Sequence, residues 1–128
     1  MAADVITIDV VGAESPIGTF AAGSLTSDGS GSSLDNYIEL GFKPKMIEFF
    51  KLNATYHDVW TWFEPMTAAS YIKSVGGSGG DVTTTGASGP TAFAGGYVDA
   101  TYGTKKAGIK VPAAFVGTSE TWYWRAAR

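Results

Sequence analysis

Short runs rich in apolar, β-branched and aromatic residues recur along the chain between Gly-, Ser- and Pro-containing segments, which predicts strands rather than helices. The best-defined region contains three such runs, Tyr37 to Phe42, Met46 to Leu52 and Val59 to Glu64. Residues 53–57 separate the last two runs by the length of a hairpin loop. We therefore expect an antiparallel hairpin here.

Weaker strand patterns lie on both sides of this hairpin. They are Asp4 to Val11, the short run Ile17 to Phe20, Tyr97 to Tyr102, Gly108 to Val116 and Thr121 to Ala126. Met66 to Val75 fits either a short helix or an irregular strand, and the Gly-, Ser- and Thr-rich residues 76–96 are typical of an exposed loop. The pattern predicts an all-β fold, a small antiparallel β-sandwich or barrel of about seven strands with an extended N-terminal segment.

A chain of 128 residues is long enough to bury one ordinary core. Within it, residues 1–35 are rich in Gly and Ser and read as an extended arm or loop with little strand. We expect residues 36–128 to form the β-sandwich domain, with the Gly-rich loop at 76–96 inside it.

All four tryptophans occur in two W-x-W triplets, Trp60 with Trp62 and Trp122 with Trp124. Side chains two residues apart on a strand point to the same face, so each triplet places two indoles side by side. Each indole carries roughly 150 to 250 Å² of surface, which has to be covered by something. Three covers are possible: the core of the domain, a partner protein, or a ligand such as a sugar ring.

The register of the hairpin decides which residues share a face with Trp60 and Trp62. If Leu52 pairs with Asp58, the two indoles lie beside Met46, Glu48 and Phe50, and the opposite face carries Ile47, Phe49, Val59, Thr61 and Phe63. Both faces are then largely apolar, so one forms the core and the other needs a second cover. We assign Trp122 and Trp124 to the core and predict one candidate interface, made of Met46, Glu48, Phe50, Trp60 and Trp62.

Charge narrows the classes of partner. The net charge of −3 argues against a nucleic-acid partner. Six acids and no Lys or Arg fall in residues 1–42, whereas residues 101–128 carry five bases and one acid. The two ends are expected to attract each other, either within one subunit or head to tail between copies. No stretch approaches the ~20 apolar residues of a membrane span, and no secretory signal is recognisable, so we expect no membrane contact.

Residues that could carry catalysis are sparse. The chain has no cysteine and a single histidine, His57, predicted to lie in a hairpin loop without a nucleophile beside it. Glu48 and Glu64 share a face in the expected register, as a glycosidase pair would, but acids at strand positions are commonplace. We predict no catalytic residue, no metal site and no cofactor, and hence no enzyme.

The segment Gly41-Phe42-Lys43-Pro44-Lys45, with the strands around it, precedes a hairpin that ends Trp62-Phe63-Glu64-Pro65-Met66. Together with Gly108 to Ala114 and Ser119 to Ala126, it resembles small virion proteins of tailed bacteriophages. The resemblance implies a non-enzymatic structural protein present in many copies, most simply a capsid decoration (cement) protein. Such a protein is made in the host cytoplasm and then bridges and stabilises shell subunits on the capsid exterior.

The partners implied by this resemblance are the major capsid protein or another virion protein, together with self-association in a homo-oligomer. Two alternatives remain open at this stage. One is a tail- or fibre-associated protein. The other is a carbohydrate-binding module that recognises host-surface glycans through the aromatic platforms.

Overall fold

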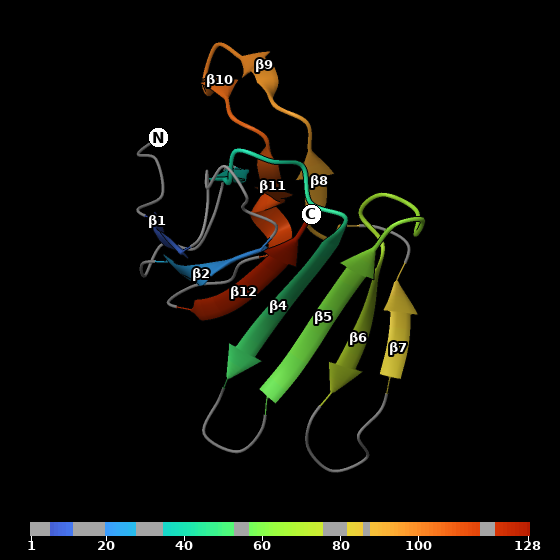
Figure 1. The fold of residues 1–128 in the computed structure, drawn as a ribbon. Coiled ribbons are helices and arrows are strands. Elements are labelled where there is room, and N and C mark those ends of the chain that lie inside the picture. Colours follow the sequence, from blue (N-terminus) through green and yellow to red (C-terminus); the bar gives the residue numbers. More distant parts are fainter. Residues whose placement is uncertain are drawn as a thin grey trace.

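The computed structural model describes residues 6–11, 20–27, 35–52, 57–75, 82–85, 88–115 and 120–128. In these ranges the chain forms twelve β-strands and one short 3-10 helix, and all strand pairs are antiparallel (Figure 1). The prediction of an all-β antiparallel fold is confirmed. The strands outnumber the seven expected, because segments that read as loops also pair.

A seven-stranded sheet forms the larger layer, in the order β1-β2-β12-β4-β5-β6-β7. Its strands are β1 (Ile6–Val11), β2 (Phe20–Ser27), β12 (Thr121–Ala127), β4 (Met46–Leu52), β5 (His57–Phe63), β6 (Tyr71–Val75) and β7 (Val82–Thr85). The C-terminal strand β12 lies in the interior of the sheet, between β2 and β4. Residues from both ends of the chain are thereby tied into the same layer.

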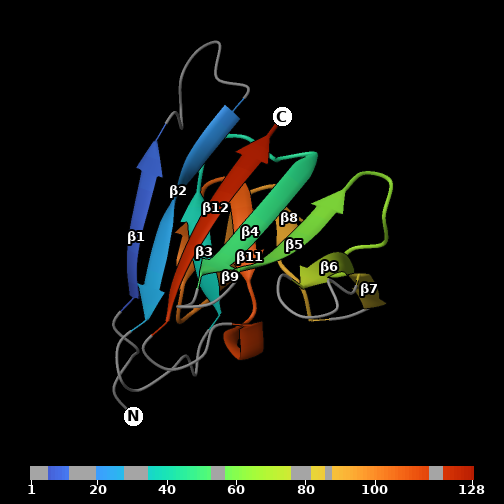
Figure 2. The same ribbon diagram turned by 90° about the horizontal axis from the view of Figure 1, so that it is seen from below.

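A three-stranded sheet covers one face of this layer, in the order β3-β11-β8. It is made of β3 (Asn36–Glu39), β11 (Gly108–Val111) and β8 (Thr91–Phe93), and the 3-10 helix Ala113–Phe115 follows β11. Figure 2 shows the large sheet in front with the small sheet behind it. The arrangement is that of a sandwich with unequal layers rather than a closed barrel.

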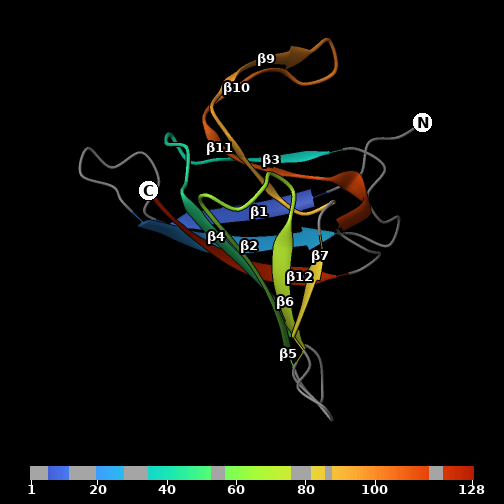
Figure 3. The same ribbon diagram turned by 90° about the vertical axis from the view of Figure 1, so that its right-hand side faces the viewer.

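A two-stranded hairpin of β9 (Gly96–Asp99) and β10 (Gly103–Lys105) extends away from the small sheet on the side opposite the large one (Figure 3). The hairpin joins β8 to β11. Tyr97 lies on it with 70% of its surface exposed.

The hydrophobic core lies between the two sheets. On β12, Trp122, Trp124 and Ala126 are buried while the residues between them are exposed, the alternation expected of a strand covered on one side. The small sheet contributes Ile38 and Ile109, which pair across β3 and β11 and are each 1% exposed. The assignment of Trp122 and Trp124 to the core is confirmed.

Two expectations about local structure are corrected. Phe20–Ser27, read as loop because of its Gly and Ser, is a strand whose Ala21 and Leu25 are fully buried. The Gly-rich tract 76–96, expected to be an exposed loop, contains β7 and β8. In both cases pairing within a sheet overrides a weak local signal. Of the two alternatives for Met66 to Val75, the structure has the strand, because residues 71–75 form β6.

Candidate functional site

The register of β4 and β5 differs by one residue from the expected one. Lys51, not Leu52, pairs with Asp58, and consequently Ile47 lies opposite Trp62 and Phe49 opposite Trp60. Because successive side chains on a strand alternate between faces, this slip moves both indoles to the other face of the hairpin.

The predicted candidate interface is therefore split. Trp60 and Trp62, 8% and 6% exposed, lie on the inner face of the large sheet, toward the small sheet, in one core with Ile47 and Phe49. Met46, Glu48 and Phe50 alternate with the buried positions of β4 and lie on the opposite side. Both faces of this hairpin are rich in apolar residues, so periodicity alone could not select the register. Glu48 also shares no face with the acid considered as its glycosidase partner, Glu64, which follows the end of β5.

We call the side of the large sheet that is turned away from the small sheet the outer face. Its described apolar side chains on strands β2, β12, β4, β5 and β6 are Phe20, Ala22, Met46, Phe50, Val59, Phe63, Ile72, Tyr123 and Ala127. Its described polar and charged side chains there are Ser24, Thr26, Glu48, Thr61, Ser74, Thr121 and Arg125. Three of its aromatic residues are strongly exposed: Phe20 at 50%, Phe63 at 44% and Tyr123 at 47%. An outer sheet face that only meets water normally carries polar residues at these positions.

The outer face is ordered in rows across the strands. One row runs from Phe20 through Ala127 and Met46 to Phe63, and another from Tyr123 through Phe50 to Val59. Residues directly opposite on neighbouring strands have their Cβ atoms about 4.5–5.5 Å apart, so each row is a continuous apolar strip.

An ion pair separates the two strips. The Nε of Arg125 donates to Oε1 of Glu48, and the Thr61 hydroxyl donates to Oε2 of Glu48 at 3.3 Å. The Arg125 guanidinium also lies 5.3 Å from the centre of the Phe50 ring. The outer face is thus apolar on both sides of one fixed charge pair.

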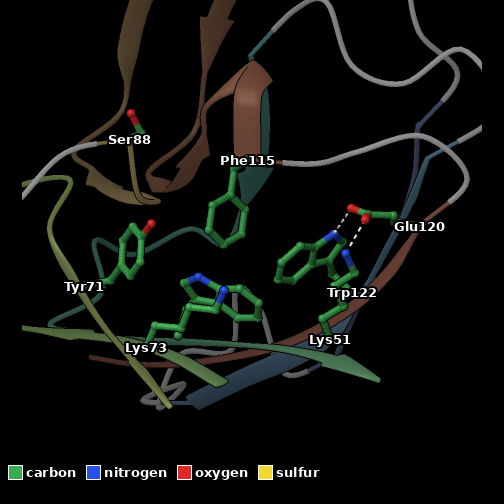
Figure 4. A pocket seen from close by; sticks show the side chains of 8 residues that line it. Lys51, Tyr71, Lys73, Ser88, Phe115, Glu120 and Trp122 are labelled. Atoms are coloured by element: carbon green, nitrogen blue, oxygen red, sulfur yellow. Dashed lines mark hydrogen bonds and ion pairs between the residues drawn. The ribbon is translucent and has the colours of Figure 1, made fainter. Parts of the chain in front are cut away.

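A pocket of about 360 Å³ opens on the inner face of the same sheet, and Figure 4 shows its side chains. Its aromatic lining brings together one indole from each W-x-W triplet: the ring centres of Trp60 and Trp122 are 4.7 Å apart at 61°. Phe115, from the 3-10 helix, lies 4.7 Å from Trp122 and 5.8 Å from Trp60, and Tyr71 lies beside it at 6.4 Å. The full lining is Lys51, Trp60, Tyr71, Lys73, Ser88, Phe115, Glu120 and Trp122.

The charged groups of the pocket are unevenly paired. Lys51 forms an ion pair with Glu120, whose other oxygen accepts the indole N–H of Trp122 at 3.1 Å. Lys73 lies over the Trp60 ring, 4.9 Å from its centre. Two ammonium groups and one carboxylate line the pocket, and Asp58, which pairs with Lys51 across β4 and β5, adds a second carboxylate on the same face. Its Oδ1 is buried without a hydrogen-bond partner among the described residues.

The sequence patterns did not predict this pocket. Trp60 and Trp122 come from different triplets, and their meeting depends on the positions of β5 and β12 in the sheet, separated by β4. Lys73 and Tyr71 lie in a segment that read equally well as helix or strand. Phe115 was assigned to a strand that in the structure ends at Val111.

An ion pair between the acidic and the basic end of the chain occurs among the described residues. Lys110 of β11 lies 3.5 Å from the carboxylate of Asp35, within the same chain. His57, expected in a loop, begins β5. Among the residues that the structure describes, no group of three or more His, Asp or Glu side chains is placed to hold a metal ion, and no helix is long and apolar enough to cross a bilayer.

Comparison with protein-family models found no match, and searches among curated proteins and solved structures found none either.

Proposed function

We propose that this protein is a non-enzymatic structural component of a tailed-phage virion, a capsid decoration protein that docks on the shell through the outer face of its large sheet. The observation that carries the proposal is the exposure of Phe20, Phe63 and Tyr123 on that face. The resemblance of residues 38–66 and of the C-terminal strands to small virion proteins supplies the class of partner.

The composition of the outer face supports protein contact. Aromatic residues, Met and Arg are enriched in the cores of protein interfaces, and the face offers all three: Phe50, Phe63 and Tyr123, Met46, and Arg125. The Glu48–Arg125 pair is already formed inside the subunit, so a partner that covers it does not have to organise two separate charges. With only 16% charged residues, the chain has little other surface charge to oppose association.

Such a protein stabilises a shell through thermodynamic linkage between binding and assembly. A protein that binds the assembled shell, and not its separated subunits, adds its binding free energy to the stability of the shell. The function requires no turnover and no cofactor. Many copies, each bridging neighbouring shell subunits, multiply the effect.

The test is co-sedimentation with purified capsids of the virus that encodes the chain. The double substitution Phe63→Ser with Tyr123→Ser removes two half-exposed rings and should leave the fold intact, while bound protein falls by roughly tenfold or more. Tyr97→Ser, at a residue 70% exposed on the β9–β10 hairpin, is the matched control and should bind like the wild type. Equal binding by the double variant and the wild type would refute the outer face as the docking surface.

Glycan recognition by a flat W-x-W platform remains the second candidate from the sequence. All four indoles are between 2% and 8% exposed, so neither triplet presents two open rings to a sugar chain. A glycan site on this protein would depend instead on the pocket of Figure 4, which lies on the opposite face from the proposed docking surface.

A further inference from the structure

The first strand, β1, forms one edge of the large sheet, and Figure 2 shows it at the end opposite to β7. Its six residues pair with β2 in one unbroken antiparallel register, from Ile6 opposite Ser27 to Val11 opposite Ala22. Among the described residues, no strand pairs with the other side of β1. That side therefore offers backbone N–H and C=O groups to which a further strand can bond.

The edge at β1 lacks the features that usually prevent pairing with another chain. Proteins block such edges with short strands, bulges, Lys or Pro. The other edge strands of the described sheets, β3, β7, β8, β9 and β10, have three or four residues each, and β10 also carries Lys105 and a register shift against β9. The longer β1, Ile-Thr-Ile-Asp-Val-Val, has no Lys, Arg or Pro and no register shift. It is the described edge best suited to pair with another strand.

The sequence of β1 is complementary to itself. Two copies related by a two-fold axis perpendicular to the sheet pair their β1 strands antiparallel. With the axis at Ile8, this residue lies opposite its own copy, Ile6 lies opposite Val10, and Thr7 lies opposite Asp9. Apolar positions then meet apolar positions, and each carboxylate meets a hydroxyl that can donate to it. An axis at Asp9 would instead bring two carboxylates together.

The burial of Ile8 favours the same arrangement. Ile8 lies opposite the fully buried Leu25 of β2 and packs against the core, but it is itself only partly buried. Directly opposite residues of an antiparallel pair have Cβ atoms about 4.5–5.5 Å apart, so Ile8 of a second copy would lie in contact with it. The pairing would therefore bury apolar surface in addition to forming backbone hydrogen bonds.

We propose that two copies of this chain join edge to edge through β1, with Ile8 on the two-fold axis, so that their large sheets form one continuous sheet. An axis perpendicular to the sheet keeps the outer faces of both copies on the same side. The dimer itself does not depend on capsid docking. If the outer face docks as proposed above, the dimer presents two such faces to the shell and binds it with greater avidity than one copy does.

Sedimentation velocity of the purified full-length protein, from low to high micromolar concentration, tests the dimer. The wild type should approach twice the mass of one chain. Thr7→Glu places a carboxylate opposite Asp9 of the other copy, twice in the dimer, and should raise the dissociation constant by roughly tenfold or more. Thr7→Glu combined with Asp9→Lys restores opposite charges and should dimerise at least as tightly as the wild type. Thr83→Glu, on the edge strand β7, is the matched control and should dimerise like the wild type.

A cross-link tests the position of the axis. The chain has no cysteine, so Ile8→Cys introduces a single thiol, which meets its own copy on the axis at a separation that a disulfide spans. Mild oxidation should convert most of this variant to a covalent dimer. Val10→Cys, at a position that lies opposite Ile6 in the proposed register, should cross-link several-fold more slowly.

Each contrary result overturns a stated part of the proposal. A wild type that stays monomeric at high micromolar concentration would overturn the dimer, and so would open-ended polymers, which head-to-tail pairing of β1 with β7 would produce. Dimerisation of Thr7→Glu like the wild type, or no recovery in the double variant with unchanged circular dichroism, would overturn the pairing of Thr7 with Asp9. Faster cross-linking of Val10→Cys than of Ile8→Cys would overturn the axis at Ile8. None of these measurements uses capsids, so failure of the dimer and failure of docking are distinguishable.

Discussion

Trp122 and Trp124 lie two residues apart on β12 and are equally buried, each 2% exposed, but their indole N–H groups have different surroundings. Trp122 donates to Glu120 at 3.1 Å. The N–H of Trp124 is buried without a hydrogen-bond partner among the described residues. A buried donor without an acceptor costs about 1–3 kcal/mol.

This contrast predicts that replacing each tryptophan by Phe lowers the free energy of unfolding by different amounts. Trp122→Phe loses ring volume and a hydrogen bond to a carboxylate, whereas Trp124→Phe loses ring volume but removes the unpaired donor. We expect Trp122→Phe to lower the free energy of unfolding by about 1–2 kcal/mol more than Trp124→Phe, measured by urea denaturation. Equal losses, or a larger loss for Trp124→Phe, would contradict the contrast.

Tyr37, Phe93 and Tyr102 form a cluster of rings on the small sheet and the adjoining turn. Tyr37 lies 5.3 Å from Phe93 and 4.9 Å from Tyr102, ring centre to ring centre. Burial raises the pKa of both tyrosine hydroxyls above the ordinary value of 10.0. The neutral phenol is therefore favoured in the folded state.

The raised pKa values make the stability of the fold depend on pH. Above pH 10.0 the unfolded tyrosines lose their protons first, so the folded state binds more protons and its stability falls as pH rises. We expect the free energy of unfolding to drop less between pH 9 and pH 11 in Tyr102→Phe than in the wild type. Tyr97→Phe, outside the cluster, is the matched control; a Tyr102→Phe slope equal to that of the wild type would refute the prediction.

At the scale of strands, the small sheet depends on one close approach. A Cβ on Gly108 would collide with the backbone carbonyl oxygen of Ile38 and lie 2.9 Å from the nitrogen of Leu40. Both neighbours are backbone atoms of β3 or of the residue after it, so they can give way only if the strands separate. The absence of a side chain at Gly108 allows β3 and β11 to pair at this distance.

We therefore expect Gly108→Ala to lower the free energy of unfolding by more than about 3 kcal/mol. Gly103→Ala is the control, because its Cβ would meet nothing within 4 Å and the cost is limited to the strained φ of 68°, about 1 kcal/mol. Urea denaturation of both variants tests the difference. A Gly108→Ala protein as stable as Gly103→Ala would contradict the close approach.

Periodicity predicted the strands where apolar residues are dense. The hairpin of β4 and β5, the closing strand β12 and the burial of Trp122 and Trp124 followed from local pattern. Strand β2 was missed because its Gly23 and Ser24 resemble a loop, and only pairing with β1 and β12 reveals it.

The candidate site was harder to predict than the strands. A strand pattern with apolar residues on both faces carries no information on which face is buried, so the β4–β5 register was wrong by one residue. The pocket depends on β12 being inserted beside β4, which no local pattern encodes. Its Lys73 lies on β6, a strand that the sequence did not distinguish from a helix.

At the scale of the whole molecule, the large sheet separates two surfaces. Its outer face carries the exposed rings of Phe63 and Tyr123, and its inner face carries the core and the pocket with Lys73.

This separation predicts that docking does not depend on the pocket. Lys73→Gln should co-sediment with capsids like the wild type. Loss of capsid binding in Lys73→Gln would indicate that the inner face takes part in docking.

The most direct test of the docking surface is hydroxyl-radical footprinting of the protein, free and bound to purified capsids. If the outer face docks on the shell, oxidation of Phe63 and Tyr123, which are 44% and 47% exposed, should fall several-fold on binding. Oxidation of Tyr97, on the β9–β10 hairpin, should stay unchanged. Protection of Tyr97 with continued oxidation of Phe63 and Tyr123 would contradict the account.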